Sequence, residues 1–90
     1  MMTTINQDAQ QAAEEVYYLF GNSVRTIRRA NDLTQAELAA RAGMNKTYLV
    51  RIESGDKNLT LRTAQRLACA LDVELTVLLK GVKWTVQNAN

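Results

Sequence analysis

Residues 33–55, LTQAELAARAGMNKTYLVRIESG, decide the fold of this 90-residue chain. Thr34 followed three residues later by Glu37 is a capping box, which predicts a helix over residues 35–42. Gly43 stands where the chain must reverse direction through a positive φ, a conformation that costs a residue with a Cβ about 1 kcal/mol or more. The stretch therefore predicts a capped helix that ends in a sharp turn.

A second short helix is expected directly after this turn. Asn45 is a good N-cap, so the helix should begin at Lys46 and continue to about Ser54, where Gly55 ends it. Helices about eight residues long are not stable alone and must pack on other parts of the chain. The positions predicted to face inward are apolar or small: Leu38, Ala39, Ala42, Leu49 and Ile52.

The other side of this second helix is polar. Lys46 and Thr47 lie on its first turn and Arg51 lies one turn later, a pattern that suits contacts with base edges in a DNA major groove. Val50 is placed to meet a thymine methyl group, and Gln35, at the start of the preceding helix, is placed for a phosphate contact. The alternative interpretation is a solvated helix face. The predicted base-contacting residues are Asn45, Lys46, Thr47, Val50 and Arg51.

Residues 24–79 resemble the phage repressor/Cro superfamily of helix-turn-helix (XRE-like) regulators. The matching residues are Val24, Ile27 and Arg28; Leu33, Thr34, Gln35, Leu38 and Ala39; Gly43; Ile52, Glu53 and Gly55; and Leu61, Ala64, Leu67, Ala68 and Leu71. The resemblance implies an all-α domain of five helices and a buried ion pair between Arg28 and Glu53. It also implies DNA backbone contacts around the end of the second helix. The predicted backbone-contacting set is Gln35, Tyr48, Ser54, Lys57, Asn58 and Arg62.

Charge is unevenly divided along the chain. Residues 1–20 carry a net −3, residues 21–66 carry nine Lys or Arg against four Asp or Glu for a net +5, and residues 67–90 balance. The positive charge therefore coincides with the two short helices, as binding to nucleic acid requires. Further candidates for phosphate contacts are Arg25, Arg29, Arg41 and Arg66.

Three segments are expected along the chain: a helical extension at 1–21, the helix-turn-helix domain at 22–79 and a tail at 80–90. Gly21 and Asn22 interrupt an apolar stripe that begins at Ala9. Either one long helix bends there or two helices meet, and we predict the break because both residues prefer turns and caps. Tyr17, Tyr18 and Phe20 make the extension aromatic. They either pack on the core or serve dimerisation or another protein partner.

The carboxyl-terminal part gives a divided signal. Thr60 should cap a fourth helix with an apolar face of Leu61, Ala64, Leu67, Ala68 and Leu71. Residues 73–79 fit a short helix better than a strand, whereas residues 82–87 alternate as a strand does. That strand either pairs with its copy in a second subunit or folds back. The predicted dimer interface is Leu75, Leu78, Leu79, Val82 and Trp84.

Composition excludes several classes of protein. The chain has no histidine and one cysteine, and it shows neither carboxylates at metal spacing nor a glycine-rich phosphate loop, so we expect no enzyme, metal or cofactor. Cys69 is expected to be a small buried hydrophobe. The sequence has no apolar run of membrane-spanning length and no export leader, which predicts a cytoplasmic protein without membrane association.

These features predict a sequence-specific regulator of transcription that binds double-stranded DNA. A symmetric homodimer that represses by binding an inverted repeat fits best, because two recognition helices about 34 Å apart can read two half-sites. Restriction–modification controllers, Cro-like proteins and antitoxins, which also bind a toxin, all fit this description. The alternative class is a protein–protein interaction module that uses the same fold without DNA.

Overall fold

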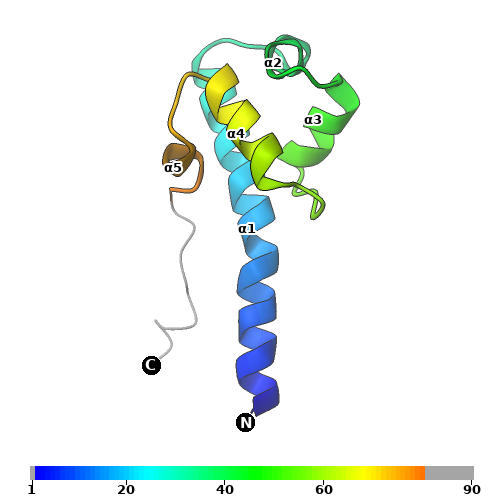
Figure 1. The fold of residues 1–90 in the computed structure, drawn as a ribbon, viewed down its shortest axis with the longest axis vertical. Helices are drawn as coiled ribbons and strands as arrows, with labels where there is room; N and C mark the ends of the chain where they lie inside the picture. Colours follow the sequence, from blue (N-terminus) through cyan, green and yellow to red (C-terminus); the bar gives the residue numbers. More distant parts are fainter. Residues whose placement is uncertain (1, 81–90) are drawn as a thin grey trace.

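The computed structural model describes residues 2–80, and for residues 2–8 and 12 it describes the backbone alone. The helices of this part of the chain are joined by turns and loops, and it contains no strand, as the predicted all-α class requires. One long helix runs through the molecule, and the shorter helices gather around its carboxyl-terminal half (Figure 1). The elements are α1 (Met2–Ala30), α2 (Gln35–Ala42), α3 (Lys46–Glu53), α4 (Leu61–Ala70) and α5 (Leu75–Leu78).

The predicted caps of α2 and α3 are confirmed. Thr34 Oγ1 accepts from Glu37 N at 3.0 Å and Glu37 Oε1 accepts from Thr34 N at 2.8 Å, which completes the capping box. Gly43 has φ 70°, in the left-handed region. Asn45 Oδ1 accepts from Tyr48 N at 2.7 Å and so begins α3. Local hydrogen bonds thus fix both ends of the turn between the two helices.

The core lies where α1, α2, α3 and α4 meet. The inward positions predicted for α2 and α3 are all buried, and Val24, Leu67 and Leu78 are completely inaccessible. The whole apolar core comprises Phe20, Val24, Leu38, Ala39, Ala42, Leu49, Ile52, Ala64, Leu67, Ala68, Leu71 and Leu78. Because the short helices bury their apolar faces together, they gain a stability that neither has alone.

The predicted break at Gly21 and Asn22 is wrong, because α1 continues through both residues. Gly21 is buried at the crossing of α1 and α3, where a Cβ would lie 2.2 Å from Ile52 O. The glycine therefore permits a close approach of two backbones and does not mark a turn. The boundary predicted between the extension and the domain lies within a continuous helix.

Two residues of α4 also differ from prediction. Leu61 was expected in the core but is 76% exposed, and Cys69 was expected to be buried but is exposed. The buried positions of α4 are Ala64, Leu67 and Ala68. Cys69 follows Ala68 directly and so lies about 100° further around the helix, away from the core. Leu61 lies in the first turn, beyond the part of α4 that is covered.

The aromatic residues of the extension have three different environments. Phe20 is 1% exposed and belongs to the core, Tyr17 is half-buried, and Tyr18 is 63% exposed. Toward the amino terminus Ala9 and Ala13 are exposed, so the apolar stripe is covered only from about Val16 onward. The extension is thus an elongation of the first helix of the domain.

The helix predicted within residues 73–79 is present as α5, so the alternative of a strand is wrong. Leu78 is fully buried within the protomer, which removes it from the predicted dimer interface. Leu75 and Leu79 remain partly accessible. The predicted strand at 82–87, with Val82 and Trp84, lies outside the described residues.

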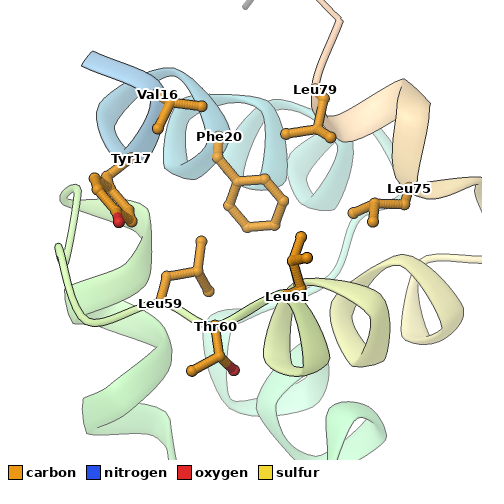
Figure 2. Close-up of a pocket in the computed structure, with 9 residues that line it drawn as sticks. Val16, Tyr17, Phe20, Leu59, Thr60, Leu61, Leu75 and Leu79 are labelled. Carbon is orange, nitrogen blue, oxygen red and sulfur yellow. The ribbon is translucent and has the colours of Figure 1, made fainter. Parts of the chain in front are cut away.

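An apolar groove lies between α1, the start of α4 and α5. Figure 2 shows Phe20, Leu61, Leu75 and Leu79 around it, with Tyr17 at one end. Its volume is about 210 Å³. The complete lining is Val16, Tyr17, Phe20, Leu59, Thr60, Leu61, Ala64, Leu75 and Leu79. Leu75 and Leu79, both in the predicted dimer interface, thus border one apolar surface.

Candidate DNA-recognition surface

Helix α3 has a buried side and an exposed side. Leu49 and Ile52 are at most 1% exposed and attach the helix to the core. Lys46, Thr47, Val50 and Arg51 are all exposed. Positions 46, 47, 50 and 51 are spaced by one, three and four residues, so their side chains share one face of the helix. The residues predicted to contact bases are therefore brought together on a surface that the protomer leaves uncovered.

Residues at the two ends of α3 use part of their hydrogen-bonding capacity within the protein. The Oδ1 atom of Asn45 caps the helix, which leaves the Nδ2 amide for any contact with DNA. Ser54 Oγ donates to Val50 O at 3.0 Å. Tyr48 is half-buried and packs against the core. Asn45 and Ser54 thus stabilise the two ends of α3, and Tyr48 helps to hold the helix against the core. All three border its exposed face.

The ion pair implied by the family resemblance is present. Arg28 Nε donates to Glu53 Oε2 at 2.7 Å, and Arg28 Nη2 donates to Glu53 Oε1 at 3.2 Å. Arg28 and Glu53 are 7% and 2% exposed. Arg28 Nη1 also donates to Leu33 O at 2.8 Å. A bidentate pair of this kind fixes the relative orientation of α1 and α3.

Gln35 belongs to the same buried network. Its Nε2 donates to Glu53 Oε1 at 3.0 Å, and the residue is only half exposed. The sequence predicts a phosphate contact that Gln35 makes together with the dipole of its helix. Because the donor group is directed to Glu53, the side chain links α2 to α3, and the nearby helix amino terminus is the part left for an anion.

Two arginines that were candidates for phosphate contacts are bound to carbonyl groups at helix ends. Arg25 Nη2 donates to Glu53 O at 2.7 Å, at the carboxyl end of α3. Arg66 donates from Nε to Ala42 O at 3.1 Å and from Nη2 to Gly43 O at 2.7 Å. The last carbonyls of a helix have no partner within it and carry partial negative charge. These arginines therefore stabilise the ends of α2 and α3.

The loop after α3 and the first turn of α4 supply further basic and polar groups. Lys57, Asn58 and Arg62 are exposed, as contacts with a DNA backbone require. Lys57 Nζ lies 3.6 Å from Glu14 Oε1 of α1, and both side chains are largely accessible. An exposed pair of this kind contributes at most about 1 kcal/mol, so a phosphate can replace the carboxylate.

Asp56 was not identified from the sequence. Its side chain is 8% exposed and its Oδ2 lies 3.5 Å from Arg51 Nε. Oδ2 is buried and has no hydrogen-bond partner among the described residues. The residue immediately follows Gly55, whose φ of 97° turns the chain at the end of α3. A carboxylate therefore lies against one of the residues predicted to read bases.

Within the part of the chain that the structure describes, no group of His, Cys, Asp and Glu could hold a metal ion. In that same part, no helix combines the length and apolar character that crossing a bilayer requires.

Comparison with known proteins gives consistent matches over this domain. The helix-turn-helix family model HTH_3 matches residues 24–78. Control protein C.SmaI of Serratia marcescens is 33% identical over 78 residues, which cover 84% of this chain and 93% of that protein. The immunity repressor protein of Bacillus phage phi105 is 33% identical over 58 residues, which cover 64% of this chain and 40% of that repressor.

A solved structure shows the same fold. The restriction-modification controller protein C.AhdI from Aeromonas hydrophila superposes with a TM-score of 0.66 at 35% identity, over 69% of this chain and 94% of that one. The sequence motif and the helix arrangement agree with these matches. The chain therefore belongs to the helix-turn-helix family of repressor/Cro-like regulators and is a DNA-binding regulator of transcription.

Proposed function

We propose that this regulator is a homodimeric repressor of the restriction–modification control type, which binds an inverted-repeat operator and blocks transcription by occupying it. Similarity to the control protein of Serratia marcescens and to the controller structure from Aeromonas hydrophila supports this assignment over an antitoxin or a Cro-like phage protein. The single observation that carries the proposal is the uncovered face of α3, with Lys46, Thr47, Val50 and Arg51 exposed together.

In this proposal α3 lies in the major groove with its amino-terminal turn nearest the base edges. Lys46 and Arg51 donate to the acceptor edge of guanine, and Val50 packs against a thymine methyl group. Thr47 and the Nδ2 amide of Asn45, whose side chains are shorter than those of lysine and arginine, supply further polar contacts. Each good bidentate contact discriminates against the wrong base by about 1–3 kcal/mol.

Contacts with the DNA backbone would surround this face. The side chains proposed for them are Tyr48, Ser54, Lys57, Asn58 and Arg62, together with the α2 amino terminus at Gln35. Such contacts supply affinity that does not depend on sequence and that falls as salt concentration rises. The net charge of +5 on residues 21–66 favours them.

We place the dimer interface on the apolar groove and on α5. Leu75 and Leu79 line the groove, and Leu61 at its edge is 76% exposed. A second copy that covers this surface removes large apolar side chains from water, which favours association. The tail residues Val82 and Trp84 follow α5 in sequence and are proposed to extend the interface.

The operator can be found by selecting bound sequences from a pool of random duplexes. The expected result is an inverted repeat whose half-site centres are separated by about 10–10.5 base pairs or a multiple of this spacing. Affinity for the selected sequence should exceed affinity for random DNA by about 10³-fold or more. Failure to enrich any sequence would contradict site-specific binding, and a single unrepeated site would contradict a symmetric dimer.

A further inference from the structure

Asp56 occupies a position that the fold of the loop determines. Its backbone N donates to Arg51 O at 3.0 Å, which closes the end of α3. Its Oδ1 accepts from Asn58 N at 2.8 Å. Beneath the loop, a Cβ on Gly55 would lie 3.4 Å from the Cα of Tyr18, so α1 packs closely against this turn. These contacts fix the carboxylate without using its second oxygen.

That second oxygen, Oδ2, is buried and accepts no hydrogen bond from the described residues, although buried polar atoms are almost always paired. The charged group that lies close to it is the guanidinium of Arg51, with Nε at 3.5 Å. The side chain of Arg51 is 63% exposed, so most of it is accessible to a ligand. Together with Val50, Ser54 and Gly55, the two residues line one hollow at the end of α3.

We propose that Asp56 is a positioning residue for Arg51 and thereby determines a guanine preference in each half-site. The inference rests on the proposed function, because it requires α3 to lie in the major groove. A flexible arginine loses much side-chain freedom when it binds a base, and an ion pair that already orients the guanidinium removes part of this loss. With the Nε edge facing Asp56, the two terminal nitrogens remain as the donors directed toward guanine O6 and N7.

The charge of Asp56 makes it possible to distinguish the positioning of Arg51 from a contribution to affinity for DNA of any sequence. A carboxylate near the DNA backbone repels phosphates, so neutralising it should not weaken binding to random DNA. Asp56 therefore favours the correct base while it opposes binding that is independent of sequence. A residue that merely shaped the fold would change both kinds of binding in the same direction.

The test is the substitution Asp56→Asn in the 90-residue chain, with the operator obtained by selection. Asparagine keeps the Oδ1 acceptor for Asn58 N, removes the charge that faces Arg51 and replaces the acceptor Oδ2 by an amide donor. We expect preference for guanine over adenine at the base pair that Arg51 reads to fall about tenfold, while affinity for random DNA stays the same or rises. Binding to operators substituted at that base pair, measured by fluorescence anisotropy, gives both quantities.

Two matched variants control the measurement. Asp72→Asn makes the same change of charge on an exposed residue beyond α4 and should leave base preference unchanged. Arg51→Ala should abolish the same guanine preference, and adding Asp56→Asn to it should then have no further effect on that preference. Circular dichroism and urea denaturation check that each variant is folded.

The possible outcomes are distinct. Loss of preference at one base pair per half-site, absent in Asp72→Asn and already complete in Arg51→Ala, supports the inference. Unchanged preference in Asp56→Asn, or an equal loss of affinity on all sequences, overturns it while leaving site-specific binding intact. If the wild-type protein itself selects no sequence, the proposed function fails and this inference fails with it.

Discussion

Glu53 is where several polar contacts of the domain converge. Arg28 and Gln35 donate to its carboxylate, and Arg25 donates to its backbone carbonyl. The side chain is 1% exposed, so its charge depends on these partners for compensation. The three donors come from α1 and α2, and Glu53 ends α3. This residue therefore joins the first two helices to the third.

We expect Glu53→Ala to lower the free energy of unfolding by about 3–5 kcal/mol, because it leaves Arg28 buried without its partner. Urea denaturation followed by circular dichroism measures the loss. Glu53→Gln keeps an acceptor for the buried donors and serves as the milder comparison if the alanine variant does not fold. A loss below about 1 kcal/mol for Glu53→Ala would show that water or other groups compensate Arg28.

Prediction of individual residues succeeded where the role of a residue depends on its neighbours in sequence. The caps Thr34 and Asn45 depend on backbone groups three residues away, so local spacing reveals them. Asp56, Arg25 and Arg66 act on groups that only the folded chain brings near. For Cys69 the general preference of cysteine for burial was misleading, because the helical period places position 69 away from the core.

At the scale of elements, the structure of α1 depends on a contact that sequence does not display. A glycine followed by asparagine is unfavourable within a helix, which predicts a break. The helix nevertheless continues, since Gly21 permits the backbone of α1 to approach Ile52 O and Glu53. Packing of α1 against α3 therefore outweighs the low helix propensity of Gly21 and Asn22. For α2 and α3, by contrast, the helix ends match those predicted from their capping residues.

Gly21→Ala should consequently destabilise the protein although alanine favours helix formation. The new Cβ would meet backbone atoms of α3, and overpacking of this kind typically costs about 1–3 kcal/mol. Asn22→Ala, at the adjacent exposed position of α1, is the matched control and should be neutral or stabilising by up to about 0.7 kcal/mol. Thermal unfolding of both variants makes the comparison, and equal stabilisation by both would contradict a tight crossing.

The capping box of α2 leads us to expect that the stability of the folded protein depends on pH. Hydrogen bonds from the backbone and hydroxyl of Thr34 lower the pKa of Glu37. The ionised carboxylate therefore stabilises the folded state fully above its unfolded pKa of about 4.3, and this stabilisation is lost as pH falls through the lower, folded value. The urea midpoint of the wild type should exceed that of Glu37→Gln at pH 6, and the difference should shrink in acid. A difference that does not vary with pH would assign the stabilisation to packing.

At the scale of the whole molecule, we expect two protomers to associate through the apolar groove. Leu61→Glu places a charge at the edge of the groove and should raise the dissociation constant of the dimer at least tenfold, about 1.4 kcal/mol. Because Leu61 is 76% exposed, the protomer itself should remain folded. Gln65→Glu, one turn along α4 and also exposed, is the control and should dimerise normally. Sedimentation velocity over a range of concentrations measures both variants.

Trp84 provides an independent test of the same interface, since the chain has one tryptophan. If the tail lies between protomers, its fluorescence should shift to longer wavelength as dilution separates the dimer. An emission spectrum that stays constant through dissociation would exclude Trp84 from the interface.

For the Leu61→Glu variant, association as strong as that of the wild type would place the interface away from the groove.

At the molecular scale, the fold was more accessible to sequence than the surface on which two protomers meet. The repressor/Cro-like motif identified the domain and its five helices, because that motif specifies both helix spacing and core positions. Assignment of interface residues was less successful, since Leu78 has the same helical spacing as Leu75 but is buried in its own protomer. Which apolar residues face a partner depends on how α5 docks, and residue type alone does not show this.

The exposure of Cys69 affects how these association measurements should be made. An accessible thiol on each protomer can oxidise to a disulfide between two chains, given time and air. Such a covalent product would sediment as a dimer whatever the state of the groove. Reductant, or a Cys69→Ser background, is therefore needed before any oligomer is attributed to noncovalent contacts. The same thiol also offers a single attachment point for a maleimide dye.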